Sequence, residues 1–166
     1  MKFSSILPSG DGKDGSMRQR ILALHGAVVD AVLGWTEGDR LGLKDDFPLR
    51  FEVMVLAVSS VLVALKDDPE RVQGLWDMTF EGFEVSLRNR GVNDIRMGAR
   101  MRVLLQHAMG RSRVYMDAIN GKDETALRQA IIRNVFNGSV RQQETVEILL
   151  SSVLNLPGRV LGGINS

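Results

Sequence analysis

The longest apolar stretch of the chain, FEVMVLAVSSVLVAL at residues 51–65, constrains the fold more than any other feature. Its 15 residues fall short of the roughly 20 that a membrane-spanning helix needs. A helix that is apolar on every side is stable in water only when other elements surround it. We therefore expect this segment to form the buried central helix of a domain, with an interfacial segment as the alternative.

Start and stop signals place further helices on both sides of this segment. A first helix is expected over residues 16–35, where apolar residues recur at spacings of three and four. The central helix should begin at Pro48, after a loop rich in helix breakers. Asp68 followed by Pro69 then combines an N-cap with a proline at the first helical position. This pair predicts the start of a third helix, which continues to Arg90.

The second half of the chain carries three more expected helices. Gly91 suits the left-handed position that follows a helix end, and either Asn93 or Asp94 can cap a fourth helix. Asp123 caps a fifth, and a sixth is expected over residues 139–155, ending before LPG. No segment has the alternation of a strand. The prediction is an all-α fold, a single bundle-like helical domain of about six helices.

Length and composition predict one domain with short flanking segments. A chain of 166 residues is long enough for one core, and its 44% hydrophobic and 25% charged residues are typical of a soluble protein. We expect a disordered leader over residues 1–15, the helical domain over 16–156, and a flexible tail over 157–166. The leader lacks the apolar core of a signal peptide and the arginine-rich pattern of a presequence, which predicts a cytoplasmic location.

Catalytic and metal-binding patterns are scarce in this sequence. There is no cysteine, and neither His25 nor His107 has a histidine or carboxylate at helical metal-ligand spacing. DDPER, at Asp67 and Asp68, matches a diphosphate-binding pattern of prenyl-transferring enzymes, but the following Pro69 favours helix capping. We therefore predict a protein that is not an enzyme and needs no cofactor or metal. A small enzyme with a helical cavity stays as a third alternative.

The stretch from Arg88 to Tyr115 concentrates positive charge, with seven arginines against one acid. A helical projection separates a core-facing side from two basic flanks. The core-facing side carries Met97, Met101, Leu104, Leu105, Ala108, Ser112, Tyr115, Met116 and Ile119. One flank carries Arg96, Arg100, His107 and Arg111, and the other carries Arg102 and Arg113. Asp77, Glu81 and Glu84 on the third helix are expected to answer part of this charge.

A nucleic-acid interface does not fit the whole chain. The formal net charge is +1, aromatic residues are 5%, and no nucleic-acid-binding motif is present, so we predict no direct specific nucleic-acid binding. Met101, Met109 and Met116 suit either adaptable core packing or a soft surface for a protein partner.

Several sequence words resemble those of the ubiquinol–cytochrome c chaperone family. They are LHGAVV at residue 24, RFEVMVL at 50, LWDMTFEGFEVSLRNRGVNDIRMGARMR at 75, GRSRVYMDAI at 110 and ALRQAIIRNVFNG at 126. The resemblance implies an all-helical, non-enzymatic assembly factor for the respiratory ubiquinol–cytochrome c reductase. It also implies newly made cytochrome b as the client, with the ribosome or a small partner subunit as further contacts.

The same resemblance implies roles for individual residues. The family pattern falls on Arg50, Phe51, Gly91, Asp94, Arg100, Gly110, Arg111, Tyr115, Arg133 and Asn134. Gly91 and Asp94 are expected to stop and start helices, Gly110 to admit another helix, and Arg50 to reach an acid in the bundle. A partner-binding face is expected at Arg96, Arg100, Arg111 and Tyr115.

The leading hypothesis is therefore a chaperone that binds cytochrome b through a basic helical face. Its arginines also predict peripheral contact with anionic lipid at the inner face of the membrane, since each basic residue near such a surface contributes about 1 kcal/mol. The alternative is a general helical adaptor or regulatory protein with another protein partner.

Overall fold

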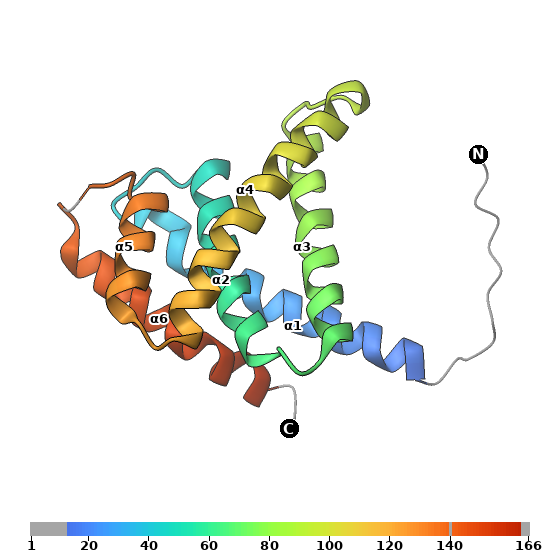
Figure 1. The fold of residues 1–166 in the computed structure, drawn as a ribbon. Coiled ribbons are helices and arrows are strands. Elements are labelled where there is room, and N and C mark those ends of the chain that lie inside the picture. The colour runs from blue at the N-terminus through green and yellow to red at the C-terminus, as the bar shows by residue number, and fades with distance from the viewer. Residues whose placement is uncertain (1–12, 140, 164–166) are drawn as a thin grey trace.

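The computed structural model describes residues 13–139 and 141–163. Within these ranges the fold is all-α, with six α-helices, one short 3₁₀ helix and no strand, which confirms the predicted fold class (Figure 1). The elements are α1 (Lys13–Thr36), η1 (Glu37–Asp39), α2 (Phe47–Ala64), α3 (Pro69–Asn89), α4 (Asp94–Asn120), α5 (Glu124–Asn134) and α6 (Gln143–Gly162). Of the leader predicted over residues 1–15, residues 1–12 lie outside the described part of the chain. Residues 13–15 belong to α1.

Helix α2 is the centre of the bundle, as its composition predicts. It packs against α1, α3, α4 and α6, and its side chains from Val55 to Leu62 are all buried. Two of these are serines, whose hydroxyls donate to backbone carbonyls of the same helix: Ser59 to Val55 at 2.6 Å and Ser60 to Ala57 at 2.8 Å. By length and composition α2 could cross a membrane, but in this fold other helices cover it.

The helix starts follow the capping signals in the sequence. The carboxylate of Asp68 accepts a hydrogen bond from the backbone N–H of Arg71 at 3.1 Å, with Pro69 at the first helical position. Asp123 accepts from the N–H of Ala126 at 2.9 Å in the same way. Each such cap typically contributes about 1 kcal/mol, because it satisfies a backbone donor that lacks an intrahelical partner.

The turn between α3 and α4 has the geometry that Gly91 predicts. Gly91 has a φ of 86°, its N–H donates to the carbonyl of Arg88 at 3.0 Å, and the N–H of Val92 donates to that of Leu87 at 3.1 Å. This is the Schellman pattern, which needs a left-handed residue that glycine adopts without strain. The side chain of Asn93 caps α4 by accepting from the N–H of Arg96, and Asp94 is the first helical residue.

Helices α3 and α4 form an arm that extends beyond the bundle, with their connection at its tip (Figure 1). The buried side chains of α3 recur every four residues: Leu75, Thr79, Phe83 and Leu87. In α4, Met97 and Ala108 are buried but nothing between them is. Leu105 was expected on the core side, and this was wrong, because its side chain is 44% exposed. In Figure 1, this part of α4 lies beside α3.

Helix α6 differs most from its prediction. The helix expected to end before Pro157, at the start of a flexible tail, continues to Gly162 with the proline inside it. An interior proline costs about 3 kcal/mol, since it removes a backbone hydrogen bond and crowds the preceding turn. The buried side chains of Leu156 and Val160 bind the last turns of α6 to the core and offset this cost. Residues 164–166 lie outside the described part of the chain.

Candidate interaction surface

A buried ion pair joins α2 to α4. Nε of Arg111 lies 2.5 Å from a carboxylate oxygen of Glu52, and both side chains are mostly covered. Glu52 is the one charged residue of the apolar run over residues 51–65, so burying that run requires a cation beside it. Burial raises the pKa of Glu52 above its ordinary range, although the charge of Arg111 partly opposes this rise.

Tyr115 follows Arg111 by four residues in α4 and is fully buried. Its hydroxyl accepts a hydrogen bond from Nδ2 of Asn134 in α5 at 3.0 Å. Burial raises the pKa of the phenol to about 12. The projection of α4 placed Tyr115 on the core side correctly, but its assignment to a partner-binding face was wrong. Arg111 is likewise engaged inside the fold, because a cation is needed there to balance Glu52.

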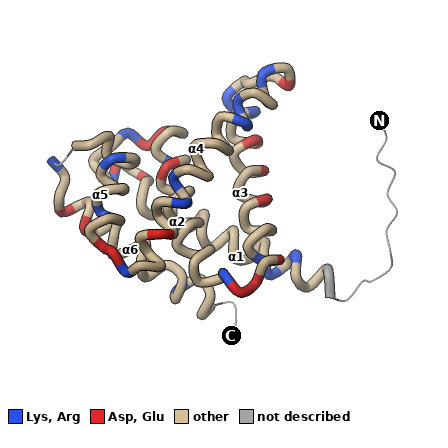
Figure 2. Tube along the Cα trace, viewed as in Figure 1, with Lys and Arg blue, Asp and Glu red and all other residues tan. Residues whose placement is uncertain are grey.

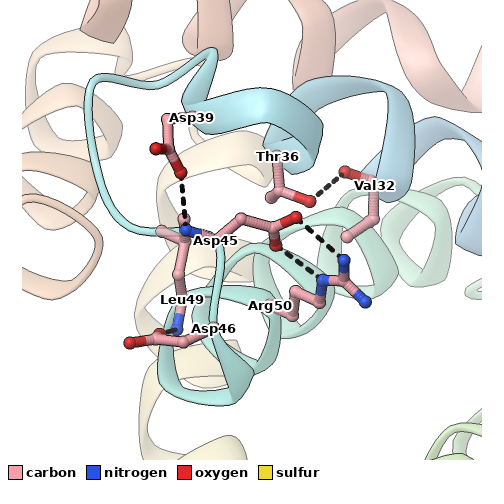
Figure 3. Close-up of polar contacts among 7 residues, drawn as sticks. All are labelled: Val32, Thr36, Asp39, Asp45, Asp46, Leu49 and Arg50. Atoms are coloured by element: carbon pink, nitrogen blue, oxygen red, sulfur yellow. Dashed lines mark hydrogen bonds and ion pairs between the residues drawn. The ribbon is translucent and has the colours of Figure 1, made fainter.

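Arg50 reaches an acid, which lies in the loop before its own helix and not in the bundle as expected (Figure 3). Its Nε and Nη2 donate to the two carboxylate oxygens of Asp45 at 2.7 and 2.9 Å. The Arg50 guanidinium lowers the pKa of Asp45 mainly through this hydrogen bonding. The backbone N–H of Asp45 donates to Asp39, and Asp46 caps α2 by accepting from the N–H of Leu49. The role of Arg50 is therefore to hold the loop against α2.

Gly110 was expected to admit a neighbouring helix, and the structure contradicts this. A Cβ built at this position meets no described atom within 4 Å, and the residue faces solvent. A close helix approach occurs instead at Gly74, where a Cβ would clash with Cδ1 of Ile21 in α1.

Arg96 and Arg100 are exposed near the tip of the arm, and Figure 2 shows basic residues gathered there, with acids along α3. Within the described ranges neither arginine forms an ion pair. Among the described residues, the expected pairing with the acids of α3 holds for Arg88 of this stretch and not for the arginines of α4. Asp77 instead accepts a hydrogen bond from Gln73, and Glu84 pairs with Arg88, four residues along on the same helix. The positive charge of this part of α4 thus remains available to a partner.

An apolar groove runs between α3 and α4, with a volume of about 510 Å³. Its lining includes Trp76, Phe80, Gly98, Met101, Leu105 and Met109. The rings of Trp76 and Phe80 stack with their centroids 5.5 Å apart, and Met109 is 55% exposed. Aromatic rings give large apolar area, and methionine side chains adapt to different shapes. We call this surface the arm groove.

The exposed arginines Arg96 and Arg100 and the arm groove lie on different sides of α4. Arg96 and Arg100 each lie two residues from Gly98, which lines the arm groove. Because successive residues of an α-helix are about 100° apart, both arginines lie on the opposite side of α4 from the groove. Arg102, by contrast, lines the groove itself. Sequence reasoning missed the groove as a site, although Met101 and Met109 had been considered for a partner surface.

The described part of the chain does not bring metal-ligating groups together. Within residues 13–139 and 141–163, no three His, Asp or Glu side chains are grouped as metal ligands would be. Asp68, the second acid of DDPER, caps α3 and also accepts from Nε of Arg71 at 2.6 Å. Its pKa is lowered mainly by the hydrogen bond from the backbone of Arg71. This acid therefore has the capping role that Pro69 predicts.

Comparison with known proteins adds two findings. The family model described as "Ubiquinol-cytochrome C chaperone" matches residues 39–155 of the chain. Among solved structures, the fold resembles one described as the Cbp3 homolog from Brucella abortus, at a TM-score of 0.71 and 23% sequence identity. That similarity covers 89% of this chain and 83% of the other. A comparison with curated proteins finds no significant match.

Proposed function

We propose, from the premise that this chain belongs to the ubiquinol–cytochrome c chaperone family, that it is a non-enzymatic assembly factor which holds newly made cytochrome b. The observation that carries the proposal is the exposed apolar arm groove. Monomeric soluble proteins rarely leave large apolar patches uncovered unless the patch binds something. A client that is itself a membrane protein offers apolar helices that match such a groove.

The groove has the features of a surface that receives an amphipathic or apolar helix. Helix-in-groove recognition places side chains at spacings of three, four and seven residues into a hydrophobic channel between two helices. Trp76 and Phe80 supply rigid area from α3, and Met101, Leu105 and Met109 supply adaptable area from α4. Arg102 at the groove offers a cation to an acid or a helix C-terminus of the client.

The tip of the arm supports a position at the membrane. Arg96 and Arg100 are exposed and unpaired with described residues, and Ile95, which precedes Arg96 near the tip, is 92% exposed. Basic side chains next to an exposed apolar one suit the anionic surface of a bilayer. We therefore place the protein in the cytoplasm, in peripheral contact with the inner face of the membrane, where the client is inserted.

The groove is tested by filling it. Gly98 lies in a helix interior, and a Cβ there meets no described atom within 4 Å, so Gly98→Leu fills groove space without a clash. The matched control is Gly82→Leu, which fills a separate cavity on the other side of α3. Both changes remove the helix cost of glycine, about 1 kcal/mol, so both variants should fold.

The readout is recovery of cytochrome b with the tagged protein from solubilised membranes. We expect wild type and Gly82→Leu to recover cytochrome b, and Gly98→Leu to recover much less. Equal recovery with Gly98→Leu refutes the groove as the client site. Recovery of a different protein in place of cytochrome b favours the adaptor alternative, and ribosomal proteins or a small subunit in the eluate identify further partners.

Membrane contact has its own test. The double change Arg96→Gln and Arg100→Gln should reduce flotation with liposomes containing anionic lipid, with about 1 kcal/mol lost per arginine. Arg113→Gln is the control, because Arg113 is exposed on the same helix further from the tip. Flotation that does not depend on anionic lipid contradicts this part of the proposal.

A further inference from the structure

A second cavity lies on the other side of α3 from the arm groove, between α1, α2 and α3. Its volume is about 400 Å³, within the range of roughly 300–1,000 Å³ usual for ligand pockets. Its wall is aromatic: the ring centroids of Phe51 and Phe83 are 5.0 Å apart, and that of Phe47 is 6.2 Å from Phe83.

One end of this cavity carries a cation without an acidic partner. The guanidinium carbon of Arg90 lies 5.3 Å from the centroid of the Phe47 ring, and Arg90 forms no ion pair with any described residue. Arg50 also lines the cavity, but its charge is answered by Asp45. Arg90 is thus the group at this site that would gain most from an anion.

The other end carries a polar atom without a hydrogen bond. His25 lines the cavity. Its Nε2 atom is buried and has no hydrogen-bond partner among the described residues. Burial lowers the pKa of His25, against the opposing charge of Glu81, so the imidazole is neutral near neutral pH. Buried polar atoms are nearly always satisfied, and an orphan in a cavity is a place where a ligand atom gains a hydrogen bond.

The polar groups of α3 that face the cavity are already satisfied within their own helix. The hydroxyl of Thr79 donates to the carbonyl of Leu75 at 2.7 Å, and that of Ser86 donates to the carbonyl of Gly82 at 2.9 Å. This leaves Nε2 of His25 and the guanidinium of Arg90 to bind a ligand's polar groups. The eight helical steps from Gly82 to Arg90 span about 12 Å along α3.

We propose that this cavity binds a medium-chain amphiphilic anion, with its charged head at Arg90, its chain along Phe47, Phe51 and Phe83, and a hydroxyl or carbonyl near its far end bonded to His25. The head lies at Arg90 because Glu81 repels an anion from the His25 end. The site is separate from the arm groove, so the proposal does not depend on the client.

Gly82 makes the test sharp. It shares a stripe of α3 with Ser86 and Arg90 at four-residue spacing, all three line the cavity, and a Cβ at Gly82 meets nothing within 4 Å. Gly82→Leu therefore fills the cavity while leaving the fold intact, and a thermal scan verifies this. Gly98→Leu, which fills the arm groove, is the matched control.

The experiment is isothermal titration of the full chain with ω-hydroxydecanoate. We expect saturable binding to wild type, Gly98→Leu and Arg90→Lys, and affinity reduced about tenfold or more in Gly82→Leu and Arg90→Gln. The uncharged diol of the same chain length should bind about tenfold more weakly, and acetate not at all. Absence of saturable binding to wild type, or binding that Gly82→Leu leaves unchanged, overturns the proposal. Equal affinity for decanoate and ω-hydroxydecanoate overturns the contact with His25.

Discussion

The ion pair between Glu52 and Arg111 gives the clearest prediction about stability. Changing Arg111 to methionine keeps most of the side-chain volume but leaves the Glu52 carboxylate buried without its cation. Removing one partner of a buried pair costs about 3–5 kcal/mol. The side chains of Arg111 and Glu52 are 27% and 15% exposed, so solvent screens part of the loss. We expect Arg111→Met to lower the free energy of unfolding by about 2–3 kcal/mol.

The pH dependence identifies Glu52 as the origin of that loss. Burial raises the pKa of Glu52 above its ordinary value of 4.5, and removing Arg111 removes an opposing influence, so the pKa rises further in the variant. Because its pKa is raised in the folded state, the Glu52 carboxyl binds more protons in the folded protein than in the unfolded chain. The free energy of unfolding therefore falls as the pH rises above 4.5. The deficit of Arg111→Met should therefore shrink on acidification toward pH 4.5.

The assay is urea unfolding at several pH values, followed by circular dichroism. The control is Arg113→Met, an exposed arginine of the same helix without an ion pair to any described residue, which should change stability by less than about 0.5 kcal/mol. The double variant Glu52→Leu with Arg111→Met should recover most of the lost stability, because no buried charge remains. A deficit that is independent of pH, together with additive effects in the double variant, would refute the reasoning.

Three further predictions follow from single positions. Gly42→Ala should lower the free energy of unfolding, measured in urea, by about 1–3 kcal/mol. Gly42 has a φ of 65°, and a Cβ there would lie 2.5 Å from Nε2 of Gln142, which donates a hydrogen bond to the Gly42 carbonyl. An unchanged urea midpoint contradicts this prediction. Tyr115 is the single tyrosine, so an ultraviolet titration reports it alone. It should ionise near 12 in the folded protein and near 10.0 after denaturation, with its contribution to stability lost between those values; a folded-state titration near 10.0 would show an exposed phenol. Pro157→Ala should raise stability by about 1–3 kcal/mol if α6 continues through this position, and no gain would indicate that the helix ends before it.

The helices could be predicted from the sequence because their signals are local. Asp68 with Pro69, Asp123 and Gly91 each fix a boundary through backbone geometry within a few residues. Helix α6 escaped the same rules at Pro157, because the burial of Leu156 is a tertiary effect that a local signal does not contain.

The candidate surface depended more on tertiary packing than on sequence pattern. Glu52 and Arg111 come from different helices, and only the isolated charge in an apolar run indicated that a cation was needed. Arg111 and Tyr115 were assigned to a partner surface from a resemblance that does not distinguish buried from exposed positions. Leu105 has the spacing of a core residue, yet it lines the arm groove because α4 leaves the bundle there.

The central claim is that the arm groove holds the client, and site-specific photo-crosslinking tests it most directly. A photoreactive amino acid replaces Leu105 in the groove or, as control, Ile148, which is exposed on α6. Cells synthesising labelled cytochrome b are then irradiated. We predict an adduct with newly made cytochrome b from position 105 and none from position 148. No adduct from position 105, or equal yields from both positions, would contradict the account.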